Sequence, residues 1–200
     1  AAVAGRSVAA QAEGRLVQPR IWRYNSFAGP PLGRPRRTGR ATQARRQPGS
    51  AMKPFVWGAA IESRRFTPAT VVYDTPDVYR DPWTGKEWKP RNFEKDQFDG
   101  PMLLTAALAH SKNTVSVKLT DALGVDAVIG FAQRMGIASE LPKNLTLALG
   151  TGEVQPLELV NAYAGLADGG RYVPPVMILR VRDRHGNVLL QETPSAPVPA

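Results

Sequence analysis

RQPGSAMKPF, residues 46–55, is the stretch that decides the fold of this chain. Pro48-Gly49 predicts a tight turn, and from Ser50 to Ser63 the apolar residues recur three or four positions apart, as they do along one face of a helix. We therefore expect a helix to begin at or beside Ser50. Residues three apart on a helix share a face, so Ser50 Oγ and Lys53 Nζ are expected within hydrogen-bonding reach of each other.

A serine in this chain needs a base other than the usual ones. The sequence has no cysteine and only two histidines, His110 and His185. This excludes thiol chemistry and leaves almost nothing for a serine-histidine-aspartate triad or a histidine-built metal site. A lysine can take the proton of a serine only if burial or a neighbouring positive charge lowers its pKa. Because Ser-x-x-Lys also occurs by chance, the pattern alone proves little.

The net charge of +9 is concentrated at one end of the chain. Residues 1–49 hold ten arginines, no lysine and one acid, Glu13, whereas residues 50–200 hold sixteen basic and sixteen acidic residues. Residues 1–39 show no sustained apolar period, so we predict no element there. Three interpretations stay open: a disordered basic arm, an arm that binds nucleic acid or an anionic surface, and a GC-rich gene translated out of frame.

The remainder of the sequence predicts one domain with a largely helical middle. Extended chain is expected over 71–93, with a hairpin turn in DPWTGKEW (81–88). Helices are expected at about 101–110, 114–123, 125–135 and 156–168, followed by two strands within 176–190 and a Pro-Ala tail. No apolar run approaches the roughly 18 residues that a bilayer span needs, and the first residues lack the layout of a signal peptide.

A second motif, Ser-Lys-Asn at 111–113, lies at the junction of two predicted helices. A hydroxyl and a carboxamide would project there into one cleft. Serine and asparagine are also common helix caps, and Lys112 fits a solvated charge equally well. His110 fits a packing or surface residue better than a catalytic base.

Three stretches together resemble, in order and spacing, the transpeptidase domain of class A penicillin-binding proteins. They are RQPGSAMKPF, FDGPMLLTAALAHSKN and LALGTGEVQPLELVNAYAGLADGG, within about Arg40 to Leu190. Ser-x-x-Lys is a motif of penicillin-binding proteins and serine β-lactamases, and Ser-Lys-Asn resembles the Ser-x-Asn form of the transpeptidases. The resemblance implies an α+β fold of this type over residues 40–200, a helical subdomain with part of an antiparallel sheet, and leaves 1–39 outside it.

The implied activity is acyl transfer on peptidoglycan stem peptides. Ser50 would attack the D-Ala-D-Ala carbonyl and Lys53 would accept its proton. Ser111 would relay a proton to the leaving amine, and Asn113 would orient the substrate amide and Lys53. β-Lactams would acylate Ser50 because they mimic D-Ala-D-Ala.

The resemblance implies further properties of the site and its setting. Gly150 and Thr151 are weaker candidates for substrate binding, since a role in shaping the helix junction behind the site fits them better. No cofactor and no metal are implied. The parent proteins of the family are anchored in the bacterial inner membrane, and the domain faces the periplasm.

The sequence also departs from the family pattern. The family carries a Lys-Thr-Gly strand that binds the substrate carboxylate, and these 200 residues contain no Lys-Thr-Gly. We therefore expect a fragment with little or no turnover of its own. The alternatives are a β-lactamase or β-lactam sensor of the same fold, and a non-catalytic module whose basic arm binds nucleic acid or an anionic surface.

Overall fold

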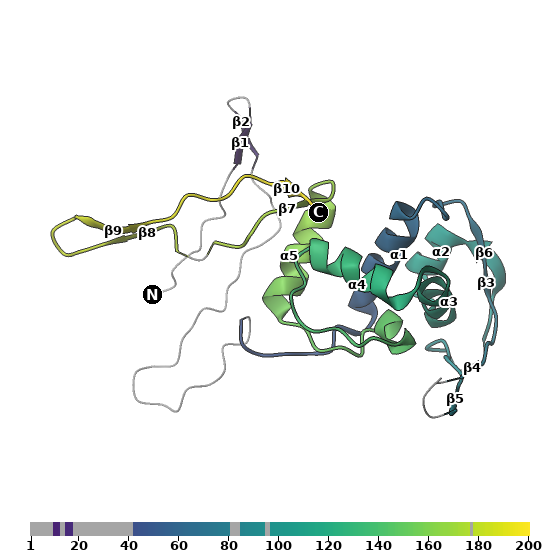
Figure 1. The fold of residues 1–200 in the computed structure, drawn as a ribbon. Helices are drawn as coiled ribbons and strands as arrows, with labels where there is room; N and C mark the ends of the chain where they lie inside the picture. Colours follow the sequence, from purple (N-terminus) through teal and green to yellow (C-terminus); the bar gives the residue numbers. More distant parts are fainter. Residues whose placement is uncertain (1–9, 13–14, 18–41, 81–84, 95–96, 177) are drawn as a thin grey trace.

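The computed structural model describes residues 10–12, 15–17, 42–80, 85–94, 97–176 and 178–200. The helices of this part gather into one body, and the strands lie at its margins (Figure 1). The helices are η1 (Gly49–Met52), α1 (Lys53–Glu62), α2 (Leu104–Ala109), α3 (Asn113–Leu123), α4 (Val125–Arg134), η2 (Leu145–Leu149) and α5 (Pro156–Ala167). The strands are β1 (Ala10–Ala12), β2 (Arg15–Val17), β3 (Val71–Asp74), β4 (Tyr79–Arg80), β5 (Glu87–Trp88), β6 (Gly100–Leu103), β7 (Arg171–Tyr172), β8 (Arg180–Arg182), β9 (Val188–Gln191) and β10 (Val198–Pro199).

Helix α1 forms the centre of the helical body. The helix predicted at Ser50 is confirmed, and its first turn is the 3-10 helix η1 that runs into α1. Pro54 suits the first turn of α1, where a backbone N–H would have no partner in the helix. α1 contacts α2, α3, α4 and η2, and apolar side chains on most sides of it are buried. The buried set comprises Phe55, Val56, Trp57, Ala59 and Ala60.

The surrounding helices pack closely against α1. Gly58 lets α4 approach, because a Cβ at this position would lie 2.4 Å from the ring of Phe131. From α5, the ring of Tyr163 meets that of Phe55 edge to face at a centroid distance of 5.5 Å. α3 contributes Val115 and Leu119 to the same core. The predictions for α3, α4 and α5 are confirmed to within a residue or two at each end.

The helix predicted over 101–110 is wrong in its first third. Residues 100–103 form β6, which pairs antiparallel with β3 so that Val71 faces Leu103 and Asp74 faces Gly100. Helix α2 begins only at Leu104, whose N–H donates to Thr70 O at 2.8 Å. The apolar spacing continues through both elements, and the pairing with a strand thirty residues away decides the conformation of the first.

The remaining strands form short antiparallel pairs. β4 and β5 place Tyr79 opposite Trp88, as the predicted hairpin requires, while turn residues 81–84 lie outside the described residues. The predicted pair β8 and β9 is present and extends away from the helical body (Figure 1). All residues of the two strands are exposed. In the Pro-Ala tail, for which no element was predicted, β10 pairs with β7.

One pair occurs where no element was predicted. β1 and β2 align Ala10 with Val17, within the arginine-rich segment 1–39. Three-residue strands carry too short a pattern for an apolar period to reveal. Most of that segment lies outside the described residues, so the three interpretations of the basic arm stay open. No helix in the described part is long and apolar enough to cross a membrane.

The central position of α1 gives a prediction for stability. Phe55 is fully buried and contacts Tyr163, so Phe55→Ala should lower the free energy of unfolding by about 3–5 kcal/mol. Phe93 is 98 % exposed, and Phe93→Ala should change it by less than about 0.5 kcal/mol. Urea unfolding of both variants measures the difference. Equal effects of the two substitutions would contradict this assignment of the core.

Candidate active site

Lys53 is a buried amine surrounded by oxygen atoms. Its side chain is at the start of α1, and the residue is 1 % exposed. Nζ donates to Ser111 Oγ at 2.9 Å, to Asn113 Oδ1 at 2.6 Å and, over a short contact, to the backbone carbonyl of Ser111. Burial lowers the pKa of Lys53 to about 8, because the charged form loses its hydration. A fraction of the amine is therefore neutral near pH 7.

Ser50 lies in the turn directly before Lys53 and is exposed. The Lys53 N–H donates to Ser50 O, so the two residues occupy one 3-10 turn. Within the described part of the chain, Lys53 Nζ bonds to residues 111 and 113 and makes no hydrogen bond with Ser50 Oγ. The structure thus joins three of the four predicted catalytic residues directly and leaves the fourth open to solvent beside them.

The backbone of the Ser50 turn is fixed from behind. The Gly49 N–H donates to Gly150 O at 3.2 Å, and Arg46 forms an antiparallel bridge with Val154. Tyr163 OH donates to Ala51 O at 2.9 Å from the side of α5. A Cβ on Gly150 would lie 2.2 Å from Gly49 O, and the φ of Gly150 is +67°. Only glycine allows this approach.

Of the two weaker site candidates, only Gly150 has a packing position. Gly150 contacts the backbone of the Ser50 turn, whereas Thr151 is exposed and its hydroxyl pairs with that of Thr146 at 2.7 Å. His110 ends α2 and is exposed. In the described part of the chain, no group of three or more His, Cys, Asp and Glu side chains could hold a metal ion.

The Ser-Lys-Asn motif forms the tight turn between α2 and α3. Ser111 has a φ of +53°, and the Lys112 N–H returns to Ala107 O at 2.9 Å. Asn113 is the first residue of α3, and its side chain is held at both ends. Oδ1 accepts from Lys53, and Nδ2 donates to Arg91 O at 2.8 Å.

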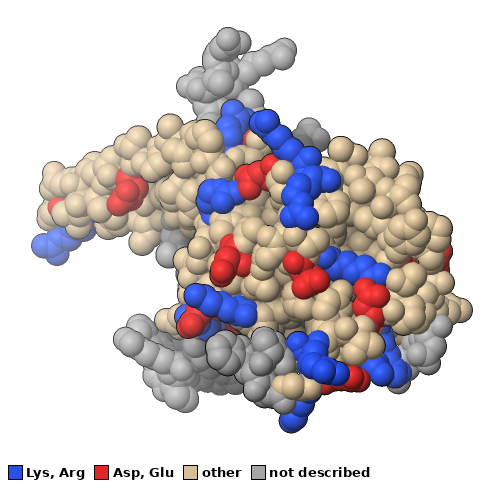
Figure 2. Space-filling view, turned by 45° about the vertical axis from the view of Figure 1, so that its right-hand side comes forward, with Lys and Arg blue, Asp and Glu red and all other residues tan. Residues whose placement is uncertain are grey.

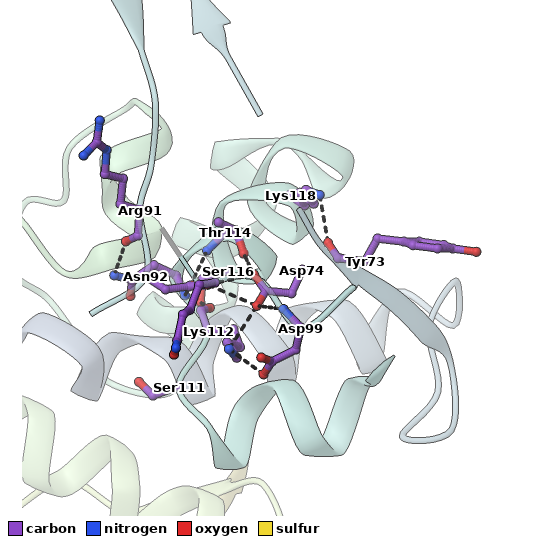
Figure 3. Close-up of polar contacts among 12 residues, drawn as sticks. Tyr73, Asp74, Arg91, Asn92, Asp99, Ser111, Lys112, Thr114, Ser116 and Lys118 are labelled. Carbon is purple, nitrogen blue, oxygen red and sulfur yellow. Dashed lines mark hydrogen bonds and ion pairs between the residues drawn. The ribbon is translucent and has the colours of Figure 1, made fainter. Parts of the chain in front are cut away.

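Lys112 is not the solvated charge that fitted the sequence. It is buried, and its Nζ lies 3.0 Å from Asp74 Oδ2 and 2.6 Å from Asp99 Oδ2 (Figure 3). Burial would raise the pKa of Asp74, but the hydrogen bonds from Thr114, Asn92, the Asp99 backbone and Lys112 together lower it to about 2. Asp74 is thus a carboxylate at any pH near neutrality, and the Lys112 ammonium compensates its charge.

Sequence reasoning missed Asp74 and Asn92, which lie behind the motif. Asp74 ends β3, and Asn92 follows β5 after a short irregular stretch. The partners are 18 to 40 residues apart along the chain, so no local spacing reveals them. The one available signal is an aspartate at the end of an apolar strand, where a carboxylate needs partners if it is buried.

The geometry defines a chemical class. A buried lysine of lowered pKa, a hydroxyl and a carboxamide in contact with it, and a second hydroxyl exposed one turn away form the kind of centre that moves a proton during acyl transfer. The chain matches the penicillin binding protein transpeptidase domain over residues 17–198, and it belongs to this family.

Relatives and solved structures agree with this assignment. The chain is 42 % identical over 156 residues to penicillin-binding protein 1A of Pseudomonas aeruginosa, covering 78 % of this chain and 19 % of that protein. The crystal structure of penicillin-binding protein 1A from Haemophilus influenzae is similar to the structure of this chain, with a TM-score of 0.72 at 35 % identity. The similarity covers 78 % of this chain and 23 % of the Haemophilus influenzae chain. The resemblance to the class A branch and the α+β fold are confirmed. The chain spans about a fifth of the length of these curated relatives.

A third comparison includes a bound antibiotic. The PonA1 protein of Mycobacterium tuberculosis, in complex with penicillin V, has a TM-score of 0.66 at 28 % identity, over 76 % of this chain and 43 % of that one.

Two glycines with the same backbone conformation test the contact behind Ser50. Gly150→Ala and Gly169→Ala both place a side chain at a φ near +67°, which costs about 1 kcal/mol. Gly169 faces open space, whereas Gly150 faces the backbone of Gly49. We expect Gly150→Ala to lower the free energy of unfolding by at least about 1 kcal/mol more than Gly169→Ala. Urea unfolding compares the two, and equal losses would refute the close contact.

Proposed function

We propose that this chain carries the nucleophile side of a D-Ala-D-Ala transpeptidase centre that crosslinks peptidoglycan stem peptides, with Ser50 as the nucleophile and Lys53 as its base. The observation that carries the proposal is the buried Lys53 amine with a pKa of about 8, one turn from an exposed serine and in contact with Ser111 and Asn113. Membership of the transpeptidase family supports the same reaction class.

The first half of the proposed reaction forms an acyl-serine ester. Neutral Lys53 takes the hydroxyl proton of Ser50, and Ser50 Oγ bonds to the carbonyl carbon of the penultimate D-alanine. The C–N bond to the terminal D-alanine then breaks. The proton passes from Lys53 Nζ through Ser111 Oγ, 2.9 Å away, to the leaving amine. In the second half, an amine of another stem peptide attacks the ester and releases Ser50 with its proton restored.

Each neighbour of Lys53 has a part in this scheme. Ser111 Oγ connects the base to the leaving group, and Asn113 Oδ1 holds the amine in place at 2.6 Å. Asn113 also orients the substrate amide. β-Lactams would acylate the same serine, and the complex of PonA1 with penicillin V supports this extension. The proposed location is the periplasmic face of the inner membrane, where class A proteins of this family act.

The alternatives differ in the fate of the acyl-serine ester. A β-lactamase would release the penicilloyl group rapidly, whereas a transpeptidase or sensor would keep it. The nucleic-acid alternative depends on the arginine-rich segment, which lies mostly outside the described residues. On the face drawn in Figure 2, Lys and Arg alternate with Asp and Glu, so the described surface seen there does not favour a polyanion.

A chimera tests the proposed nucleophile. Residues 42–200 replace the matching segment of the Pseudomonas aeruginosa protein, to which the chain is 42 % identical. We expect a fluorescent penicillin to label this chimera. Ser50→Ala should reduce the rate of labelling by a factor of about 10³ or more, because the attacking oxygen is removed. Gel fluorescence and mass spectrometry of the labelled peptide measure the rate and the position.

The matched control is Ser63→Ala, an exposed serine at the end of α1, which should label like the parent. Labelling that persists in a folded Ser50→Ala chimera would reject Ser50 as the nucleophile. The 200-residue chain alone, without a Lys-Thr-Gly motif, should label far more slowly than the chimera. Robust labelling of the chain alone would show that this motif is not required.

The pKa of Lys53 sets the pH dependence of acylation. The base must be neutral, so the rate in the chimera should rise with pH and level off above about 8. Below that value each pH unit should lower the rate roughly tenfold, since the neutral fraction falls by that factor. Stopped-flow acylation between pH 5.5 and 9.5 measures the profile. A flat profile, or activity retained in Lys53→Arg, would reject Lys53 as the base.

A further inference from the structure

Asp74 is fully buried and accepts hydrogen bonds from several segments of the chain. It is 0 % exposed at the end of β3. Asn92 Nδ2 donates to its two oxygens at 2.8 and 3.1 Å, and the Asp99 N–H donates at 3.0 Å. Thr114 Oγ1 also donates, over a short contact, and the Lys112 ammonium lies at 3.0 Å. Figure 3 shows these side chains converging on Asp74 from separate segments.

An ionised carboxylate fixes the orientation of the asparagine that faces it. A carboxylate accepts hydrogen bonds and cannot donate, so Asn92 must present its NH₂ group to Asp74. The carbonyl end of the same amide then points the other way, where Asn92 Oδ1 accepts from the Asn113 N–H at 2.9 Å. The Gln97 backbone carbonyl also accepts from Asn92 Nδ2, at 3.2 Å, so the Asp74 carboxylate and this carbonyl together fix which end of Asn92 reaches α3.

Asn92 supplies the cap that α3 lacks in its own sequence. The residue before the helix, Lys112, makes no side-chain capping bond. The first N–H groups of a helix have no partner inside it and need one from elsewhere. Asn92 Oδ1 provides this partner for Asn113, and the Thr114 N–H is 3.5 Å away. A segment twenty residues upstream thus sets where α3 begins.

The same segment sets the Asn113 side chain. The carbonyl of Arg91, next to Asn92, accepts from Asn113 Nδ2 at 2.8 Å, which leaves Oδ1 to face Lys53 Nζ at 2.6 Å. Backbone and side chain of Asn113 are both held by residues 91 and 92. Asn92 in turn is held by Asp74 and by the Gln97 carbonyl.

We propose that Asp74 is a positioning residue for this centre, which acts through Asn92 to hold Asn113 against the Lys53 amine. The inference rests on the proposed function for its catalytic meaning, but its geometry can be tested without any activity. Removing one partner of a buried ion pair such as Asp74 with Lys112 is itself destabilising, so the test has to separate the orientation of Asn92 from the stability of the fold.

Hydrogen exchange at one amide reports on the chain of contacts. Among the described residues the Asn113 N–H donates to Asn92 Oδ1, whereas the Val117 N–H lies within α3 and reports on the stability of the helix. In the 200-residue chain, Asp74→Asn should lower the protection of Asn113 by a factor of about 10 beyond any loss at Val117, because an amide at 74 no longer offers Asn92 Nδ2 two acceptor oxygens and leaves Asn92 less firmly oriented. Two-dimensional NMR in deuterated buffer measures both rates.

Three further variants make the test specific. Asp99 is half exposed and supplies the other carboxylate that pairs with Lys112. Asp99→Asn removes this carboxylate and should leave the hydrogen-exchange protection of the Asn113 N–H unchanged. Asn92→Ala removes the middle contact and should lower it as Asp74→Asn does. The double substitution Asp74→Asn with Asn92→Asp restores an acceptor opposite Asn113. It should return the protection of the Asn113 N–H toward that of the parent. Asn92→Ala keeps the test valid if Asp74→Asn does not fold.

The outcomes separate positioning from stability. Equal loss of protection at Asn113 and Val117 in Asp74→Asn, or no loss at Asn113, would overturn the proposal. In the chimera, Asp74→Asn should lower the rate of acylation by a factor of about 10 to 100 with little change in the affinity for the unreacted penicillin, as misplacement of a catalytic group does. If the parent chimera is not acylated, the proposed function fails, and the exchange experiment still decides the positioning.

Discussion

The burial of one amine governs the arrangement of this domain. The Lys53 side chain enters the helical body at the start of α1, where an unpaired ammonium would be strongly destabilised. Its three donors find three oxygen acceptors within a single short turn, residues 111–113. The turn must therefore lie against α1. Because it connects α2 to α3, it also brings these two helices against α1. Three of the four predicted catalytic residues, Lys53, Ser111 and Asn113, meet because an amine in the core requires partners.

The exposed serine depends on a different kind of constraint. Its turn has no buried side chain of its own to hold it except Met52, and its position comes from backbone contacts with residues 150 and 154 and from Tyr163. The two glycines at 49 and 150 pack main chain against main chain. The backbone of Ser50 is thus held from behind while the residue itself is exposed, which suits a group that must meet a large substrate.

Local patterns predicted the elements and the family, and contacts between distant residues explain what they missed. The helical spacing from Ser50 to Ser63 and the glycines after α3 and α5 marked helices that the structure confirms. Residues 100–103 carry the same apolar spacing, yet they form a strand because they pair with β3. Lys112 has the sequence context of a surface charge, yet it is buried in an ion pair with Asp74, which lies 38 residues earlier. The catalytic roles of Ser50, Lys53, Ser111 and Asn113 remain predictions, although Lys53, Ser111 and Asn113 are in contact.

The left-handed backbone of Ser111 links protonation to conformation. A residue with a side chain at a φ of +53° carries a conformational cost of about 1–2 kcal/mol. Lys53 donates to both the carbonyl and the hydroxyl of this residue, and these two bonds offset that cost. A proton that leaves Lys53 takes one donor with it and weakens the hold on the turn. The conformation of Ser111 and the ionisation of Lys53 are therefore thermodynamically coupled. The protonated amine favours the left-handed turn, and the left-handed turn favours the protonated amine.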